Sequence, residues 1–374
     1  MTTNDAQITL ATRLRPLTHR DSAKPFDFRV SDEESDRDWD AFLQATPHGH
    51  FQQSSIWVGV KRHEGWRPLR IVVRQGDLIR GGVQLLVRST RFGAMAYVSK
   101  GPVVDRDDEG LMNLLIQATQ GLAKLRGIRG IVLQLPDFAG HFDPLLLQQG
   151  FALNAVAKLI TATCCIDVGN PGWEELISRS TRKHIRQAGK RGVVIREGGE
   201  SELPLFFELM CATCRRQNTR PAPATPEALA QLWRPFAERG LGRLTFAECE
   251  GQVTAGLLSM RFGQRMTQWK KGWNDLHGDK HPNAMLAHEG AVWARSVGAT
   301  LVDFVGMEPQ IARAVLSQEI QTEDQLASRY AFILRMGGKP QLLPQPRVYW
   351  VNPLLRLVYG RLAPWARRYR KMDA

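Results

Sequence analysis

The stretch IVVRQGDLIRGGVQLLVR at residues 71–88 decides the fold, because it predicts two strands joined by a turn at Gly76-Asp77. The stretch LTFAECEGQVTAGLLSMRF at residues 244–262 has the same form, with its turn at Gly251-Gln252. Small residues recur early in each second strand, and the offset from Gly82 to Gly256 is 174 residues. The chain is therefore predicted to contain one hairpin unit twice.

The same order of elements follows each hairpin. Apolar residues at helical spacing over 111–125 predict a helix, which Gly127 ends before the strand GIVLQLP at 130–136. In the second copy a helix is predicted over 284–297, before the strand TLVDFVG at 300–306. We predict an α/β (α+β) protein of two tandem copies, each a mixed twisted sheet flanked by helices.

The chain length supports two domains. At about 150 residues per domain, 374 residues suffice for two separate cores. We place the boundary near the linker Gly169-Asn170-Pro171-Gly172. The predicted parts are a flexible N-terminal segment, a first domain, a second domain and a basic aromatic tail, at residues 1–25, 26–166, 167–346 and 347–374.

The net charge of +13 is confined to two segments. Residues 179–196 contain seven Lys or Arg and no acid, and residues 347–374 contain seven against Asp373 alone. A localised basic excess is typical of a surface that binds phosphates, as in RNA, a nucleotide-linked substrate or an anionic membrane. Aromatic residues among the tail arginines suit base stacking or a lipid headgroup layer, and the sequence does not separate the two. A solvated helix face and a frayed terminus remain the alternative.

Neither secretion nor a resident metal is predicted. Residues 1–24 contain no signal-peptide core, and no apolar stretch is long enough to span a membrane. Five cysteines form an odd set that fits a reducing cytoplasm. Cys211 and Cys214 spell C-x-x-C without a second pair at zinc spacing. We expect a cytoplasmic monomer, peripheral at the inner membrane face if the tail binds lipid.

Four local motifs carry a family resemblance. Residues 51–61 resemble F-x-Q-S-x-x-W-x-x-x-K, and residues 97–104 resemble Y-x-x-K/R-G-P-V. Residues 181–193 look like a basic helix leading into a strand, and residues 281–306 resemble a P-x-x-L…W-A…G…D-F-G-G block. Together they resemble the Fem family (FemABX) of peptidoglycan-bridge aminoacyltransferases, which have a tandem GNAT-type acyltransferase fold.

The resemblance implies a transferase that forms an amide bond on an amine of a cell-wall or envelope precursor. The implied donor is aminoacyl-tRNA, with a nucleotide- or lipid-linked precursor as acceptor and no cofactor. The first alternative is a GNAT N-acyltransferase of exopolysaccharide or envelope synthesis with acetyl-CoA or acyl-CoA as co-substrate. The second is a non-catalytic scaffold that binds RNA or membrane.

The chain departs from the family at three places. Where the family has F-K-x-x-F-G-G, with a Lys that helps to position the donor, this chain has Ile333, so Arg335 is the candidate replacement. His288 stands where the family often has Trp, and Val305 interrupts the D-F-G-G motif. Residues 186–191 and 239–244 do not complete the loop that holds the pyrophosphate of CoA.

The expected substrate contacts are cations, carboxylates and aromatic residues. Lys61 is a point charge for a phosphate and Arg216 a bidentate contact for phosphate or carboxylate. In the Gln268–Trp273 strand, period-two alternation places Trp269 on one face with Trp273, opposite Lys270. Each of these residues has an ordinary surface or core role as its alternative. The candidate substrate-binding residues are Lys61, Trp57, Lys100, Asp137, Arg216 and Trp269.

The candidate catalytic residues lie in the second copy. A carboxylate at the end of a strand can orient or deprotonate an amine, which points to Asp303. His288 and Glu289 lie on the last helix but point about 100° apart, and Asp303 has a buried hydrogen-bonding role as its alternative. The expected donor or RNA contacts are Arg182, Lys183, Arg186 and Arg335. No residue is predicted to be a covalent nucleophile.

Overall fold

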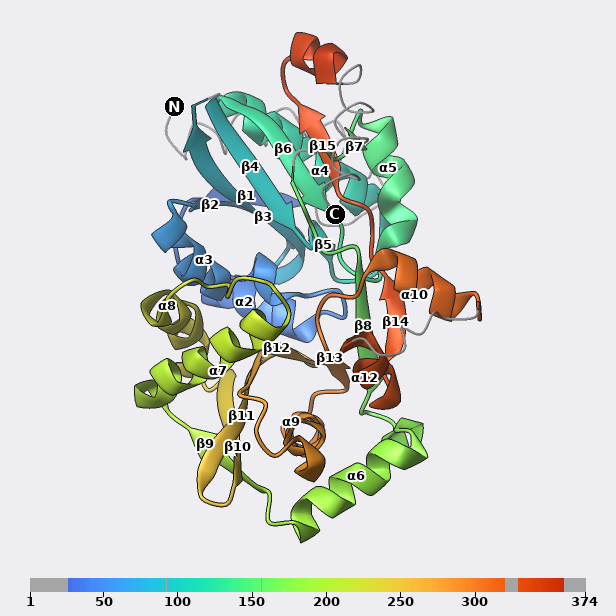
Figure 1. Ribbon diagram of the computed structural model, residues 1–374. Coiled ribbons are helices and arrows are strands. Elements are labelled where there is room, and N and C mark those ends of the chain that lie inside the picture. Colours follow the sequence, from blue (N-terminus) through green and yellow to red (C-terminus); the bar gives the residue numbers. More distant parts are fainter. Residues whose placement is uncertain (1–25, 92, 156, 320–328, 360–374) are drawn as a thin grey trace. The chain divides into compact units, whose positions relative to one another are not determined.

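The computed structural model describes residues 26–91, 93–155, 157–319 and 329–359 and divides the chain into two compact units. Unit 1 contains the chain up to Leu159 together with the segment from Leu343 onward, and unit 2 is Ile160–Leu342. Each unit has its own sheet (Figure 1). The predicted segment 1–25 and the end of the predicted tail, 360–374, lie outside the described residues.

The sheet of unit 1 has the strand order β1-β2-β3-β4-β6-β15-β7, with β5 paired to β3. It is mixed, because β4 and β6 run parallel whereas the other neighbours run antiparallel. The strands are β1 (Asp27–Ser31), β2 (Arg67–Gln75), β3 (Leu78–Thr90), β4 (Gly93–Ser99), β5 (Val103–Val104), β6 (Ile128–Gln134), β7 (Ala152–Leu153) and β15 (Arg347–Trp350).

The predicted first hairpin is confirmed as β2 and β3. Its two-residue turn is Gly76-Asp77, and Gly76 has the positive φ of 62° that such turns require. Gly82 has a packing reason, since a Cβ there would lie 2.5 Å from the carbonyl oxygen of Ile71 and 2.8 Å from the ring of Trp39. The hairpin therefore lies close against α2 (Arg37–Ala45), which carries Trp39.

Helix α4 (Glu109–Leu125) forms the apolar core of unit 1 with this sheet. Asp108 caps the helix by accepting a hydrogen bond from the Leu111 amide. All the apolar positions that the helical period selected are buried or pack against the core: Leu111, Leu114, Leu115, Ala118, Leu122 and Leu125. The described part of this unit also contains the shorter helices α3 (Ser55–Lys61) and α5 (Asp143–Gln148) and a helical segment at 353–359.

The sheet of unit 2 has the order β14-β8-β13-β12-β11-β10-β9. Its second hairpin turns at Glu250-Gly251, both with positive φ, one residue earlier than predicted, because Gln252 already pairs in β11. The strands are β8 (Ala162–Asp167), β9 (Val194–Gly198), β10 (Gly242–Cys249), β11 (Gln252–Phe262), β12 (Arg265–Trp273), β13 (Leu301–Asp303) and β14 (Lys339–Leu342).

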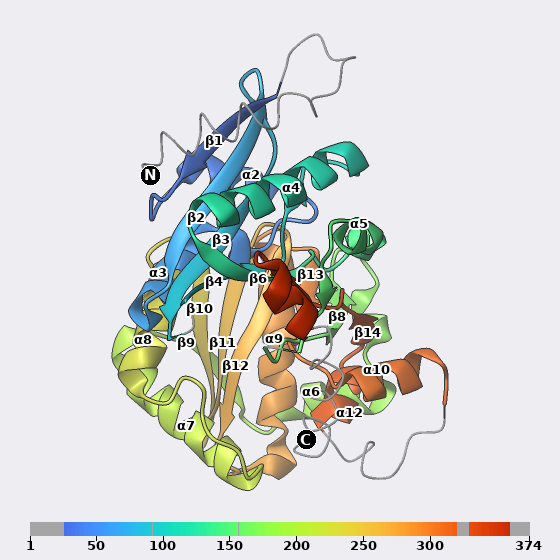
Figure 2. The same cartoon turned by 90° about the horizontal axis from the view of Figure 1, so that it is seen from above.

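Helices cover both faces of this second sheet. Figure 2 shows α7 and α8 on one side of β9–β12 and α9 on the other. Small residues allow the close approach, since a Cβ at Gly272 would lie 2.6 Å from the α7 backbone and one at Gly290 of α9 would lie 3.0 Å from Leu257. The helices are α6 (Arg179–Lys190), α7 (Leu203–Arg216), α8 (Pro226–Ala237), α9 (Pro282–Ser296), α10 (Pro309–Leu316) and α12 (Arg329–Arg335).

The two sheets correspond strand for strand, which confirms the predicted duplication. The order β1-β2-β3-β4-β6-β15-β7 matches β9-β10-β11-β12-β13-β8-β14. In both sheets the sixth strand comes from outside the local run of chain: β15 joins unit 1 after all of unit 2, and β8 precedes the rest of its own unit. The division between the units thus lies at Leu159 rather than at residue 166, and β15 belongs to unit 1 rather than to a separate tail.

Candidate functional site

A pocket of about 360 Å³ lies within unit 2. It is formed by the first turns of α6 and α9, the end of β12, the last turn of α12 and the short helix at Gly278–Lys280. The lining residues are Ser180, Thr181, His184, Trp273, Gly278, His281, Pro282, Asn283, Ala284, Phe332 and Arg335. This lining contains an arginine, two imidazoles and two large aromatic side chains but no carboxylate.

Two histidines stack in the pocket wall. The rings of His184 and His281 are 3.9 Å apart between centroids with an interplanar angle of 18°. Burial lowers the pKa of His281, and the neighbouring His184 and Arg191 lower it further. The His281 imidazole is therefore neutral near pH 7 and presents a flat ring. An anion bound in the pocket would stabilise its protonated form.

Cationic groups surround the pocket. Arg335 lines it, and the guanidinium of Arg216 lies 4.7 Å from the ring centroid of Trp273, another lining residue. The Nε of Arg216 is also 3.7 Å from a carboxylate oxygen of Asp275. Along α6, Lys183 and Arg186 are exposed and Arg182 is half-buried. An anionic ligand with a flat ring matches this combination of charge and aromatic surface.

The predicted donor contacts thus lie on the elements that form the pocket. Ile333 also lies on one of these elements, α12, but its side chain does not line the pocket. Ile333 is 7% exposed and belongs to the apolar core of unit 2, whereas its neighbour Phe332 lines the pocket. An aliphatic side chain at this position packs inward, so the cation that the family motif leads one to expect here is absent from position 333.

Asp303 is a buried carboxylate held by three groups. Its Oδ1 accepts hydrogen bonds from the Thr163 hydroxyl at 2.5 Å and from the Val305 amide at 2.9 Å. Its Oδ2 lies 3.6 Å from the guanidinium of Arg265, and the residue is 7% exposed. This geometry favours the structural alternative, because both oxygens are already engaged by the fold.

His288 and Glu289 lie outside the pocket lining. The Nε2 of His288 lies 2.7 Å from a carboxylate oxygen of Glu174, and its ring stacks on Trp173 with centroids 5.5 Å apart. Glu289 is more exposed and lies 3.9 Å from the Nδ1 of His288. These contacts tie α9 to the short helix at Trp173–Leu176.

The candidate contacts in unit 1 form two groups. Lys61 ends α3, with its ammonium 2.7 Å from Glu64 and 5.3 Å from the ring centroid of Trp57. The Lys61 side chain is 26% exposed, so an external phosphate can compete with Glu64. Lys100, in contrast, is 6% exposed, and its ammonium lies 2.5 Å from the carboxylate of Asp137.

A buried glutamine explains the motif around residue 53. The side-chain amide of Gln53 donates to the carbonyls of Gln84 and Ser99 and accepts from the Gln84 amide. A Cβ at Gly101 would lie 2.6 Å from the same amide group. The motifs at 51–61 and 97–104 are thereby joined through Gln53, so part of their sequence pattern maintains the fold.

The predicted alternation in β12 is broken. A register shift opposite Leu258 and Ser259 leaves Trp269 between the pairs formed by Gln268 and Lys270. The Trp269 ring contacts Phe236 of α8, with centroids 6.1 Å apart, whereas Trp273 lines the pocket. The prediction that Trp269 and Trp273 share one wall is therefore wrong, because a bulge changes which side chains face which side.

No group of three or more metal-ligating side chains occurs among the described residues. All five cysteines, including Cys211 and Cys214, are free thiols. Within the same part of the chain, every helix is too short or too polar to cross a bilayer.

Several pocket residues were not singled out from the sequence. His184, His281, Asn283 and Phe332 all lay within quoted motifs, yet none was selected. The sequence did hold a signal for both histidines. His184 lies within the basic helix, and His281 directly precedes Pro282, which starts α9. The contact between the two imidazoles spans about a hundred residues and could not be deduced from spacing.

Comparisons with known proteins agree with the duplicated fold. Residues 34–155 match the FemAB family model, and residues 177–310 match that of a GNAT acetyltransferase domain. The lipid II:glycine glycyltransferase of Staphylococcus aureus (strain MRSA252) is 26% identical over 199 residues, which cover 49% of this chain and 47% of the relative. The chain therefore aligns with about half the length of the curated relatives it matches.

Solved structures extend the likeness to nearly the whole chain. The crystal structure of FemX has a TM-score of 0.76 at 19% identity, covering 90% of this chain and all of that one. A tandem GNAT protein from the clavulanic acid biosynthesis pathway has a TM-score of 0.50 at 13% identity, covering 88% of this chain and 99% of that one. Taken with the two family models, these folds show that the chain has two GNAT-type units, the first of which is similar to the FemAB family over residues 34–155.

Proposed function

We propose that this protein transfers an aminoacyl group from aminoacyl-tRNA to an amine of a cell-wall precursor. The observation that carries the proposal is the unit 2 pocket, whose lining combines Arg335 and aromatic rings without a carboxylate. Such a lining suits the phosphates and bases at the end of a nucleic acid. The names of the matched relatives, lipid II:glycine glycyltransferases, point to the same chemistry.

The basic face of α6 supports RNA as the donor. Residues 179–196 contribute seven positive charges and no negative charge, and α6 supplies three of the pocket residues. Each phosphate neutralised by such a helix adds affinity that falls with salt. Arg182, Lys183 and Arg186 are accordingly proposed as contacts to the tRNA backbone, with Arg335 nearer to its charged end.

For the acceptor we propose a lipid- or nucleotide-linked precursor that carries a stem peptide. Lys61 would bind a phosphate of this precursor in exchange for Glu64. The ring of Trp57 would hold the Lys61 ammonium in place by a cation–π contact. Lys100 and Asp137 then act by holding the adjacent loop rather than by direct contact, since both are buried in a mutual ion pair.

The chemistry requires positioning more than a dedicated nucleophile. An ester is already activated toward an amine, and well-oriented reactants can recover about 7–11 kcal/mol of barrier. The residues of this chain would bind both substrates, exclude water and stabilise the developing charge. We propose that no cofactor takes part.

Contact with an anionic membrane is the remaining element of the proposal. Residues 353–359 form a helical turn that exposes Leu354, Leu355, Leu357 and Val358, with Arg356 among them. Exposed aliphatic side chains beside arginines suit the headgroup layer of a bilayer. This arrangement would keep the protein at the cytoplasmic membrane face, where a lipid-linked acceptor is found.

A second candidate donor is acyl-CoA. It is favoured by the match of residues 177–310 to a GNAT acetyltransferase domain. The loop before α9 argues against it, because its sequence contains Asp275 and Asp279 and does not form a glycine-rich phosphate loop.

The test is a donor competition read by mass spectrometry. Purified protein is incubated with a stem-peptide precursor and either tRNA charged with labelled amino acids or labelled acetyl-CoA. Transfer of an aminoacyl mass from tRNA, reduced in Arg335→Gln but not in Arg313→Gln, is expected. Arg313 is an exposed arginine of α10 outside the pocket lining and serves as the matched control. Label arriving from CoA alone would refute the proposal.

A further inference from the structure

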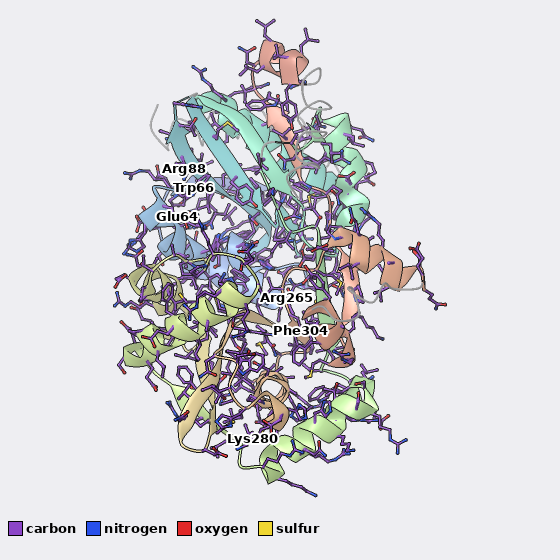
Figure 3. All side chains as sticks on the ribbon, in the orientation of Figure 1. Glu64, Trp66, Arg88, Arg265, Lys280 and Phe304 are labelled. Atoms are coloured by element: carbon purple, nitrogen blue, oxygen red, sulfur yellow. The ribbon has the colours of Figure 1, made fainter. Side chains whose placement is uncertain are left out.

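The parallel strands β12 and β13 of unit 2 pair over only part of their length and then separate. They pair only from Arg265 to Thr267, opposite Leu301 to Asp303. After Asp303 the chain turns away through Phe304, Val305 and Gly306, the last two with positive φ. Strand β12 continues to Trp273 without this neighbour, so a fork opens along its edge. Figure 3 labels Arg265 and Phe304, which lie near this fork.

Lys271 lies on the part of β12 that has lost its neighbour. It pairs with Leu257, whose side chain packs on Gly290 of α9, so Lys271 faces the α9 side of the sheet. Trp273, two residues further along the same face, lines the pocket. Lys270 faces the opposite side by alternation. Lys271 therefore lies between the fork and the pocket.

Aromatic rings rather than anions surround the Lys271 ammonium. Its nitrogen is 5.1 Å from the ring centroid of Phe304 and 6.0 Å from that of Phe332, which is also a pocket residue. Among the described residues no carboxylate pairs with it and no acceptor binds it. Burial lowers the pKa of Lys271 to about 8.

The titratable groups near the fork do not compensate this charge. On β8, burial raises the pKa of the Cys164 thiol to about 12, so the sulfur is neutral. On β13, Asp303 is engaged by Thr163, Val305 and Arg265. On α9, His288 pairs with Glu174, and on α12 the cation Arg335 adds positive potential.

Lys271 is half-buried, and a cation that loses water without gaining a partner is costly for the folded state. Local conflicts of this kind are expected at functional sites, where an enzyme holds a charge ready for one that develops during the reaction. The fork offers such a place, because its cation shares the Phe332 wall with the pocket proposed for the donor.

We propose that the Lys271 ammonium binds the oxyanion that forms on the ester carbonyl during transfer, an inference that rests on the proposed function. The amine nitrogen attacks the carbonyl carbon, and the π electron pair moves to the oxygen, which accepts a hydrogen bond from Lys271. As the carbonyl reforms, the bond to the ribose oxygen breaks, and the proton lost by the nitrogen ends on that oxygen. Lysine is unchanged at the end of the step.

The first experiment measures stability against pH in the full-length protein. Between about pH 8 and 10.4 the unfolded state binds more protons at this lysine than the folded state does, so wild-type stability rises with pH in that window. Lys271→Met removes the cost and is expected to raise Tm by about 5 °C at pH 7, with the gain shrinking above pH 10. Lys270→Met makes the same change on the other face and should show no such pattern. A lower Tm for Lys271→Met at pH 7 would overturn the inference.

The second experiment uses methylphosphonate as a tetrahedral anion. It is expected to stabilise wild-type protein and Lys271→Arg at pH 7 and to stabilise Lys271→Met much less. Equal stabilisation of wild type and Lys271→Met, or none in wild type, would contradict an oxyanion site at Lys271. This readout does not depend on any transfer activity.

Transfer assays then separate the two proposals. If wild type transfers an aminoacyl group, Lys271→Met should lower kcat by about 10²–10³-fold and Lys271→Arg should restore most of it. Unchanged kcat in Lys271→Met overturns the role of the lysine alone. A wild type that is inactive with every charged tRNA, while methylphosphonate binding still needs Lys271, refutes the aminoacyl donor and leaves the anion site established.

Discussion

Each unit has a lysine at an equivalent strand, buried in unit 1 and half-buried in unit 2, and the two lysines have opposite surroundings. Lys100 directly follows β4 and forms a 2.5 Å ion pair with Asp137, which comes just after β6. Lys271 lies in β12, the counterpart of β4, and is surrounded by Phe304 and Phe332. The strand order is the same, but only unit 1 places a carboxylate beside the cation.

The difference lies in what each carboxylate binds. Asp303 ends β13, the counterpart of β6, yet it binds Thr163 and Arg265 and leaves Lys271 alone. A buried ion pair such as Lys100–Asp137 stabilises the folded state against loss of either partner, because the remaining charge would then lie in an apolar interior. A half-buried ammonium without a carboxylate partner instead weakens the fold and is available to a ligand. The two copies thus share a strand order but differ in whether the lysine has a carboxylate partner.

The largest expected effect is on unit 1. Lys100→Met should lower the free energy of unfolding by about 3–5 kcal/mol, because the buried Asp137 carboxylate loses its ammonium partner. Urea denaturation measures this loss. In unit 2 the corresponding Met substitution is expected to have the opposite sign.

The control for this prediction removes both partners. Lys100→Met combined with Asp137→Leu should recover much of the lost stability, since no charge then remains buried. A single substitution that costs less than about 1 kcal/mol would show that the pair is not structural and would remove the contrast between the units.

A smaller effect is expected at Asp303. Asp303→Asn should cost about 1–3 kcal/mol of stability, because it weakens the hydrogen bonds from Thr163 and Val305 and the ion pair with Arg265. Thr163→Val disturbs the same network without touching the carboxylate and should also destabilise the protein. The kcat per folded molecule is expected to change little in either variant.

The outcome would also decide between the two roles considered for this carboxylate. A kcat loss above about 100-fold in Asp303→Asn, with stability retained and Thr163→Val fully active, would make Asp303 the catalytic base.

Local sequence signals predicted most of the fold. The turn glycine Gly76 and the helical spacing from Leu111 to Leu125 located the hairpin and helix of unit 1, because these elements depend on neighbours in the chain. The sixth strand of each sheet was not predicted. Strand β15 crosses more than two hundred residues to pair with β6, and no local pattern encodes such a partner.

The site was less predictable than the fold. The basic segment lies largely on α6, which contributes residues to the pocket, and Arg335 lines the same pocket, whereas the binding role predicted for these residues stays a prediction. Lys271 was not selected, because its significance depends on the rings of Phe304 and Phe332 and on a β-bulge that sets its face. Burial and the absence of a nearby carboxylate are properties of the folded state, and the sequence QWKKGW shows neither.

Removing surface charge from each unit in turn would test whether the two units also differ in RNA binding. Replacing Arg182, Lys183 and Arg186 with Gln should weaken tRNA binding by about tenfold at moderate salt and reduce the slope of log affinity against log salt by about one per lost phosphate contact. Fluorescence anisotropy across a salt series measures both quantities. If unit 2 is the RNA-binding copy, three exposed arginines of unit 1, Arg91, Arg106 and Arg129, give a matched triple Gln variant with little effect. Equal losses in the two triple variants would mean that binding is non-specific.

The smallest expected effect concerns protons in the pocket. Burial, His184 and Arg191 hold the pKa of His281 below its usual value, so the imidazole is neutral near pH 7, and a bound phosphate would favour its charged form. Anion binding should therefore take up a proton, and affinity should rise about threefold as pH falls from 7.5 to 5.5. His281→Asn is the suitable variant, because Asn tolerates the left-handed backbone at this position. Its affinity should follow pH less steeply, as measured by anisotropy with a short RNA, and an identical pH dependence in both proteins would place the anion away from the histidine pair.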